Sequence, residues 1–429
     1  MTFLLILAGV IALLFTGLPI FAGLALFGGG LLLFTQGDLG AIGEIIFGEL
    51  NRYLLVSIPL FSLMAHIMIR GRIVDDLYST AYTLTRHLPG GLGIATVAAC
   101  TIFAAISGSS VATALTIGSV AIPQMIRFGY DPKWAYGLVA AGGTLGILIP
   151  PSAPLVLYGV ITEQSIGALF MAGVVPGLMI ALMFAAFSMF QASRGERRIK
   201  REPRASLGEA MVAIRKSVWA LSLPVLVLGG MYAGVFTATE GAGMGALAAL
   251  VIAAFVYRRF SLRDLWQSAI EASRTSAMLF MIMAGAAVFG HVLTKMRVPQ
   301  EMVELVISMG IGQTGFLIAV MLLLFVLGMF LETISIILIT TPVLIPAMMH
   351  LGINPIWYAI LLTVNLELAL ITPPVGMNLF TIKAITSAPM SDIIRGVLPY
   401  VLILIVALFI LMAFPQISLW LPGLSFNVS

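Results

Sequence analysis

The chain has 429 residues, of which 60% are hydrophobic and 9% are charged, and its formal net charge is +4. Soluble domains carry roughly 25% charged residues, so this composition excludes a soluble protein, and the small net charge gives no reason to expect a nucleic-acid partner. Apolar runs of about 20 residues, the length at which a helix crosses a bilayer, recur along the whole chain. The sequence therefore predicts an all-α polytopic membrane protein.

The first half of the chain begins with MTFLLILAGV, which lacks the basic residues of a cleaved signal peptide and is interpreted as the start of a span. The predicted elements that follow in chain order are spans at 3–16, 18–35 and 53–70, a surface segment at 72–88, an apolar stretch at 92–123, an interrupted span at 134–162 and a span at 166–191.

A basic, polar linker at 193–216 separates the two halves. After it the sequence predicts spans at 219–236, 239–257 and 274–293, a surface segment at 297–309, an apolar stretch at 315–346, an interrupted span at 357–382, a span at 397–415 and a short tail at 424–429.

The two halves are related by an internal repeat. VAIPQMIRFGYDPKW at 120–134 resembles VLIPAMMHLGINPIW at 343–357. The same offset pairs Pro150 with Pro373 and Pro151 with Pro374. We therefore predict one structural unit used twice, over 1–192 and 217–423.

The stretches 92–123 and 315–346 are too long for one span and are polar in the middle, which predicts a re-entrant hairpin in each half. Each half then makes about five crossings, and an odd number inverts one half relative to the other. With the linker in the cytoplasm, only Arg52, Lys295 and Arg297 of the 22 lysines and arginines fall outside, in agreement with the positive-inside rule. Both termini are then predicted on the outer side, with Lys295 and Arg297 near a partner protein.

The hairpins turn at SGSSVAT (107–113) and at GMFLETIS (328–335), and each tip should face the proline-broken helix of its own half. A hairpin tip survives in a membrane only where protein or water satisfies its backbone. Proline has no N–H, so the carbonyls one turn earlier lose their helical donors. These freed oxygens, together with the tip hydroxyls, predict two sites for a hard cation. The alternative is that the small residues only permit close helix packing.

Acidic residues inside the apolar segments are further candidates, because burying a charge there costs at least ~2.5–3.5 kcal/mol. Glu332 at the second hairpin turn is a candidate for contact with substrate or a proton, or alternatively for stabilising a helix N-terminus. Glu367 has no acidic counterpart in the repeat and has either a coupling or a structural role. Ser152 and Asn378 follow the proline pairs and are candidates for hydrogen bonds to substrate.

Other motifs point away from cofactor chemistry. Cys100 is the only cysteine, and the four histidines lack metal-ligand spacing. GAGMGA at 241–246 fits a dinucleotide fingerprint but lies in a predicted span without a preceding strand. Just before it, Thr237 and Glu240 have the spacing of a capping box. Because no P-loop is present either, we expect no organic cofactor and no transition metal.

The motifs SGSS, GTLGILIPPS, TEGAG and ITPPVGMNLF, in this order, resemble the large membrane subunit of TRAP (tripartite ATP-independent periplasmic) transporters over the whole chain. This resemblance implies an elevator-type secondary transporter of the bacterial inner membrane, driven by sodium. It also implies a small membrane subunit and a periplasmic binding protein that delivers a carboxylate substrate. Two positions depart from the expected pattern, Ala369 in place of glycine and Ala238 in place of proline.

By this resemblance, the residues divide into two sets of candidates. The implied sodium ligands are Ser107, Ser110, Gly146, Ile149 and Pro151 in the first half and Gly328, Ala369, Thr372 and Val375 in the second. The substrate candidates are Ser107, Ser109, Ser152, Glu332, Thr333 and Asn378.

The leading hypothesis is sodium-coupled import of a small organic acid. The alternatives are a proton-coupled carrier that uses Glu332 or Glu367, a passive channel, and an intramembrane enzyme. The enzyme has the least support, because no Ser–His or Asp–Asp pair is predicted at the middle of the membrane.

Overall fold

The computed structural model describes residues 16–73, 75–194, 202–258 and 260–424, together with Gly9 and Ala12. All regular elements in these ranges are helices, which confirms the all-α prediction for this part of the chain. Seven of the described helices are long and apolar enough to cross a membrane. The predicted span at 3–16 and the tail at 424–429 fall almost entirely outside the described residues, as does the middle of the linker.

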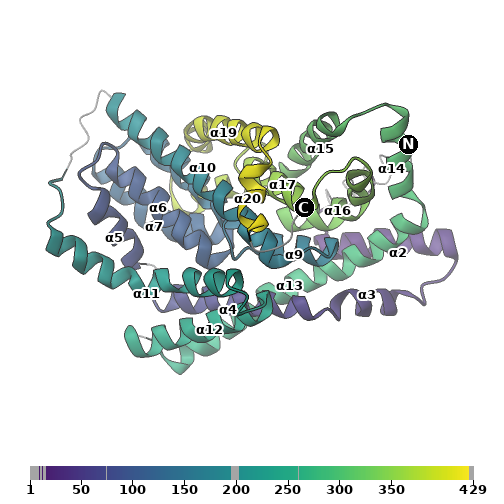
Figure 1. Cartoon of the computed structure of the whole chain (residues 1–429), viewed down its shortest axis with the longest axis horizontal. Coiled ribbons are helices and arrows are strands. Elements are labelled where there is room, and N and C mark those ends of the chain that lie inside the picture. Colours follow the sequence, from purple (N-terminus) through teal and green to yellow (C-terminus); the bar gives the residue numbers. More distant parts are fainter. Residues whose placement is uncertain are drawn as a thin grey trace.

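Six helices form a row along the lower edge of Figure 1, here called the helix row. Its members are α2 (Ile20–Gln36), α3 (Ile42–Leu50), α4 (Ser57–Arg70), α11 (Leu207–Tyr232), α12 (Ala238–Val251) and α13 (Leu262–Lys295). The longest of them, α13 of the second half, packs along α2, α3 and α4 of the first half. Both halves of the chain therefore contribute to the row.

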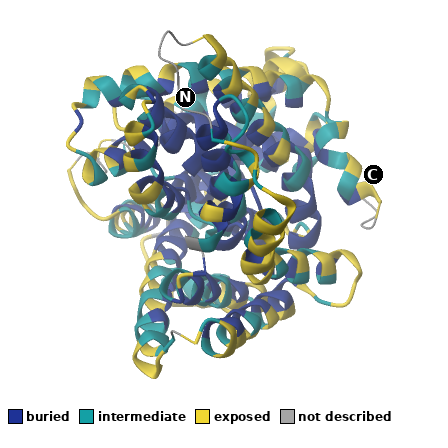
Figure 2. Ribbon diagram, turned by 90° about the vertical axis from the view of Figure 1, so that its left-hand side faces the viewer, coloured by how far each residue is buried: buried dark blue, intermediate teal, exposed yellow. Residues whose placement is uncertain are grey.

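The remaining large helices form a thicker group above the row, here called the main body, and buried residues gather in its middle (Figures 1 and 2). Both halves contribute to it as well. Its members are α6 (Gly91–Ser107), α7 (Ser110–Arg127), α8 (Pro132–Thr144), α9 (Ala153–Thr162), α10 (Ile166–Arg194), α15 (Gln313–Gly328), α16 (Thr333–His350), α17 (Pro355–Leu370), α18 (Met377–Ile385), α19 (Met390–Ala413) and α20 (Gln416–Gly423).

Glycines bring the two halves into close contact inside the main body. A Cβ atom on Gly137 of α8 would lie 1.9 Å from the carbonyl oxygen of Gly396 of α19, and one on Gly396 would lie 1.9 Å from the oxygen of Lys133. Small residues at such crossings let helix backbones approach within van der Waals distance in a membrane. This crossing therefore fixes α8 of the first half against α19 of the second.

Two short helices connect these groups. The surface segments predicted at 72–88 and 297–309 contain α5 (Asp75–Thr85) and α14 (Val298–Ser308). The first packs on α6 and α11, and the second packs on α16 and α13.

Several helix starts differ from the prediction, and capping explains two of them. α11 starts at Leu207, inside the predicted linker, because Ser206 and Glu209 form a capping box. α13 starts at Leu262 instead of 274, because Ser261 and Asp264 form another. The helices α3 and α20 were not predicted.

The two long apolar stretches each break into two helices. The first breaks between Ser107 and Ser110, where Gly108 has a φ of 58° and the Ser109 side chain caps α7. The second breaks between Gly328 and Thr333. The interrupted spans likewise divide, into α8 and α9 with the short 3₁₀ turn η2 (Leu145–Ile147) between them, and into α17 and α18.

Candidate functional site

The first hairpin tip lies directly against the break between α8 and α9, and together they form the first junction. A Cβ atom on Gly108 would lie 2.5 Å from the carbonyl oxygen of Pro151, and one on Gly146 would lie 2.6 Å from the oxygen of Ser109. No side chain fits at either glycine without a shift of the backbone. The tip and the break are therefore in backbone-to-backbone contact.

Proline leaves oxygen atoms available at this junction. The residue four positions after Gly146 is Pro150, which has no N–H to donate. The N–H groups of Leu148 and Ile149 both donate to the oxygen of Leu145 instead. The carbonyl of Gly146 is thus buried at the tip without a helical donor.

Hydroxyl groups complete the first junction. The Ser107 and Thr113 hydroxyls lie 3.0 Å apart, and Thr113 donates to the oxygen of Ser109 at 2.7 Å. Ser110 donates to Oδ1 of Asn378 at 2.9 Å. Carbonyl and hydroxyl oxygens are the donors that hard cations prefer, so the residues present fit a sodium ion.

Asn378 joins the two halves of the chain at this point. It belongs to α18, is fully buried, accepts from Ser110 and donates from Nδ2 to the carbonyl oxygen of Ala140 at 3.0 Å. Its amide therefore bridges α7 and α8 of the first half to α18 of the second. This bridge was not predictable from the sequence, because its partners lie far apart along the chain.

Ser152 and Asn378 both lie behind the surface that faces the cavity described below. The Ser152 hydroxyl is buried and donates to the carbonyl oxygen of Ile147. Neither residue lines the cavity, and each has protein partners. Their direct contact with substrate stays a prediction.

The second hairpin tip lies against the break between α17 and α18, and together they form the second junction. A Cβ atom on Gly328 would lie 2.6 Å from the Cβ of Ala369. The N–H of Thr372 donates to the carbonyl oxygen of Ala369 at 3.1 Å, and the Thr372 hydroxyl donates to Leu368 at 2.7 Å. Val375, the last of the sodium candidates, is 37% exposed. The candidate cation ligands here are again oxygen atoms, but the residues that supply them are less buried than those of the first junction.

A cavity of about 290 Å³ separates the two tips from the helix row. The tips contribute Ser107, Ser109, Glu332 and Thr333, so four of the substrate candidates face it. The opposite wall comes from α4 and α13 and includes the polar residues Ser62, His66 and Thr275.

The sequence analysis missed this second wall, although a histidine inside a predicted span was a signal for it. Among the lining residues, only Glu332 and His66 have ionisable side chains.

The three acidic candidates have different surroundings. Glu332 is the N-cap residue of α16 but makes no side-chain capping bond. Glu367 is fully buried, and neither carboxylate oxygen has a hydrogen-bond partner among the described residues. Glu240 and Thr237 exchange capping hydrogen bonds, which confirms the structural interpretation of that motif. Within the described ranges no group of three histidine, cysteine, aspartate or glutamate side chains can hold a metal.

A family model described as "Tripartite ATP-independent periplasmic transporter, DctM component" matches residues 7–417. The chain belongs to this family. It is 41% identical over 393 residues to the C4-dicarboxylate TRAP transporter large permease protein DctM of Pseudomonas aeruginosa, covering 92% of each chain. It is 35% identical over 423 residues to the ectoine TRAP transporter large permease protein TeaC of Halomonas elongata, covering 98% of this chain and 99% of the other.

These relatives are named as permeases, which confirms the prediction of a membrane transporter subunit and not an enzyme. The fold also resembles a solved structure, the YdaH transporter of Alcanivorax borkumensis, described as having an unusual topology. The TM-score is 0.63 with 14% sequence identity, over 99% of both chains. At that identity the match supports the fold alone.

Proposed function

We propose that this chain is the large membrane subunit of a sodium-coupled importer of a small organic acid. The observation that carries the proposal is the pair of junctions, each made of a hairpin tip pressed against a proline-broken helix, whose two tips line one cavity. The C4-dicarboxylate in the name of the Pseudomonas relative supports the substrate class.

In the proposed mechanism, sodium is a co-transported substrate that binds behind each tip. Ser107, Ser110 and the carbonyls of Gly146, Ile149 and Pro151 would hold it at the first junction. At the second junction the oxygens of Gly328, Ala369, Thr372 and Val375 would do so. An ion at each junction would fix the tip in the position that receives the substrate.

The organic acid would bind at the two tips, in the cavity that separates them from the helix row. Ser107, Ser109 and Thr333 line the cavity, and hydroxyl groups are suitable donors to a carboxylate. Glu332 would contact a hydroxyl or amine of the substrate, or its charge would be offset by sodium. Ser152 and Asn378 would support these groups from behind, or contact the substrate after a change of conformation.

We propose elevator-type alternating access, which the division into two groups of helices supports. The repeats 1–192 and 217–423, inverted relative to each other, would each give helices to the main body, which moves, and to the helix row, which stays fixed. The cavity extends along α4 to Ile69, next to the basic residues Arg70 and Arg72. Because basic residues favour the cytoplasmic side, this state would face the cytoplasm.

The proposed setting is the bacterial inner membrane, with both termini in the periplasm. The partners would be lipid, a small membrane subunit, and a periplasmic binding protein that delivers the organic acid. Lys295 and Arg297, at the outer end of α13, would lie near such a partner.

Uptake by the reconstituted three-component transporter tests the coupling ion. The probe is a radiolabelled C4-dicarboxylate, the substrate class in the name of the Pseudomonas relative. Replacing external sodium by choline at constant pH should reduce uptake at least tenfold. Undiminished uptake in choline would show that sodium is not the coupling ion.

Proton coupling is the second candidate, and the observation that favours it is the fully buried carboxyl of Glu367, which has no hydrogen-bond partner among the described residues. If protons drive transport, Glu367→Gln or Glu332→Gln should abolish the pH dependence of uptake while exchange of bound substrate continues. If sodium drives transport, both variants should keep their sodium dependence.

A further inference from the structure

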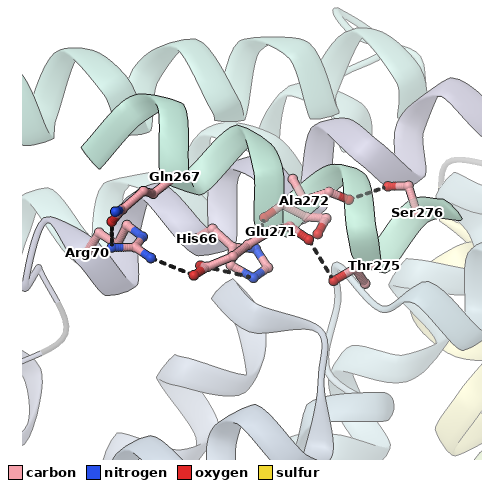
Figure 3. A network of polar contacts seen from close by, with 8 residues as sticks. His66, Arg70, Gln267, Glu271, Ala272, Thr275 and Ser276 are labelled. Atoms are coloured by element: carbon pink, nitrogen blue, oxygen red, sulfur yellow. Dashed lines mark hydrogen bonds and ion pairs between the residues drawn. The ribbon is translucent and has the colours of Figure 1, made fainter. Parts of the chain in front are cut away.

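A network of polar side chains lies on the helix row at one end of the cavity (Figure 3). It joins α4 and α13, and its ionisable members are His66, Arg70 and Glu271. Nη2 of Arg70 donates to one carboxylate oxygen of Glu271 at 2.5 Å, and Nη1 donates to the side-chain oxygen of Gln267 at 2.6 Å. The proposed sodium sites and the hairpin tips do not use any of these groups.

His66 is the ionisable member of the network that lines the cavity. Its Nδ1 lies 2.8 Å from the carbonyl oxygen of Ser62, which can only accept a hydrogen bond, so Nδ1 carries a proton. Its Nε2 lies 3.8 Å from the second oxygen of Glu271, which is too far for a hydrogen bond. Nε2 therefore has no hydrogen-bond partner among the described residues, and it donates to a carboxylate when the ring carries a proton on each nitrogen.

Arg70 also has one N–H group without a hydrogen bond. This group is at Nε, which is buried and has no hydrogen-bond partner among the described residues. A guanidinium group binds a carboxylate best through two neighbouring N–H groups and two oxygens. Glu271 uses one oxygen on Arg70 while the other faces His66, so this preferred geometry is not reached.

We propose that His66 and Arg70 form a second binding site for a carboxylate, here called the inner carboxylate site, and that the side chain of Glu271 occupies it when no substrate is there. The proposal rests on the proposed function for the direction of transport. A carboxylate leaving the tips would cross the cavity to His66 and then reach Arg70, one turn further along α4. Glu271, whose side chain is 40% exposed, would turn outward into solvent.

No neighbouring acidic side chain in the described ranges prevents a substrate carboxylate from replacing Glu271 on Arg70. Asp264, one turn before Gln267 on α13, has its carboxylate bonded to the backbone and hydroxyl of Ser261. Asp264 therefore caps α13, and unlike Glu271 it makes no ion pair with Arg70. Thr275, which lines the cavity, donates to the backbone oxygen of Glu271 and leaves the carboxylate free to move.

Charge-selective labelling of a cysteine in the cavity tests the site without knowledge of the natural substrate. Met278 lines the cavity one turn after Thr275 and is 47% exposed, so Met278→Cys places a reactive thiol there. The whole transporter in inside-out vesicles is treated with an anionic or a cationic methanethiosulfonate. Each rate of labelling is divided by the rate at which the same reagent reacts with a small thiol in solution, which corrects for the different reactivities of the two reagents. The native chain is the blank, because its only cysteine, Cys100, is fully buried.

In this background, Glu271→Gln should raise the ratio of anionic to cationic labelling about fivefold or more, because it leaves the Arg70 charge unpaired. His66→Gln added to Glu271→Gln should remove part of that gain. Gln267→Ala is the matched control, since it contacts Arg70 but carries no charge, and it should leave the ratio within about twofold. An unchanged ratio in Glu271→Gln would overturn the proposal.

A free carboxylate that slows the labelling distinguishes a carboxylate-binding site from a general electrostatic attraction of the anionic reagent. Millimolar succinate, used here as the carboxylate probe, should slow anionic labelling in Glu271→Gln and protect less when His66→Gln is added. A raised ratio without protection by succinate would also overturn the proposal. Sodium-independent uptake would contradict the proposed function but would leave this result unaffected, so the two failures are distinguishable.

Discussion

The two junctions have related sequences but differ in how tightly the structure encloses them. At the first, all residues of 145–152 are buried. At the second, Pro374 and Val375 are exposed, although they are in the equivalent part of the repeat. A sequence repeat therefore specifies where the chain breaks, but not how far the surrounding helices cover the break.

Different contacts hold the two junctions together. At the first, both partners supply a glycine, Gly146 on the broken helix and Gly108 on the hairpin tip, and each lies against the backbone of the other partner. At the second, the glycine is Gly328, at the end of the first hairpin helix, and the broken helix supplies Ala369. This arrangement explains why alanine is tolerated at position 369, where the family pattern has glycine. Gly328 on the hairpin has no Cβ and leaves room for the Cβ of Ala369.

The first junction should be the more sensitive of the two to an added side chain. Gly108→Ala would place a Cβ atom 2.5 Å from the Pro151 oxygen at a φ of 58°. Left-handed strain and overpacking together should cost about 3 to 5 kcal/mol of folding free energy. Thermal unfolding of the purified protein in detergent measures the loss.

Gly129→Ala is the matched control for this change. Its φ is 89°, but no atom lies within 4 Å of an added Cβ, so it carries the strain without the clash. Equal losses of stability in the two variants would show that the tip does not press against the break.

The bridge between the halves is the next largest contribution to the first junction. Asn378→Ala removes the bonds to Ser110 and Ala140 and leaves a buried hydroxyl and a carbonyl without these partners. The expected loss is about 2 to 3 kcal/mol of folding free energy. It should be measured by thermal unfolding, together with the sodium concentration that gives half-maximal uptake, which should rise because Ser110 loses its position.

Asn365→Ala is the control at the second junction. Asn365 makes one such bond, from Nδ2 to the oxygen of Met321, so its loss should be about half as large. If Asn378→Ala instead weakens substrate binding with no change in stability, Asn378 is a substrate contact and not a bridge.

At the second junction, the contact between the two small residues can be tested by exchanging them. Gly328→Ala would place two Cβ atoms 2.6 Å apart and should cost about 2 kcal/mol. Adding Ala369→Gly removes the second Cβ and should restore most of the stability in a double-mutant cycle. Simple additivity of the two changes would mean that these residues do not press on each other.

Local chemistry explains which of these features the sequence predicted. The breaks were predictable because proline pairs and glycine act within a few residues of themselves, as at Pro150 and Gly108. The starts of α11 and α13 were signalled by serine and acidic residues at capping spacing, a pattern overlooked where the segment was polar. The polar network beside the cavity was not predictable, because Arg70 and Glu271 are 201 residues apart and only packing of α4 on α13 joins them.

The smallest effect should come from the exposed end of the second junction. Val375 is 37% exposed, and its implied role uses the backbone carbonyl, so Val375→Ala should change folding free energy by less than about 0.5 kcal/mol. Its sodium dependence should also stay the same, since the carbonyl is retained. Ile149→Ala is the counterpart at the first junction, where the side chain is 7% exposed and packs on Gly177, and it should cost about 2 to 4 kcal/mol by thermal unfolding. Similar costs at the two positions would mean that the second junction is as tightly enclosed as the first, and the contrast between the junctions would no longer hold.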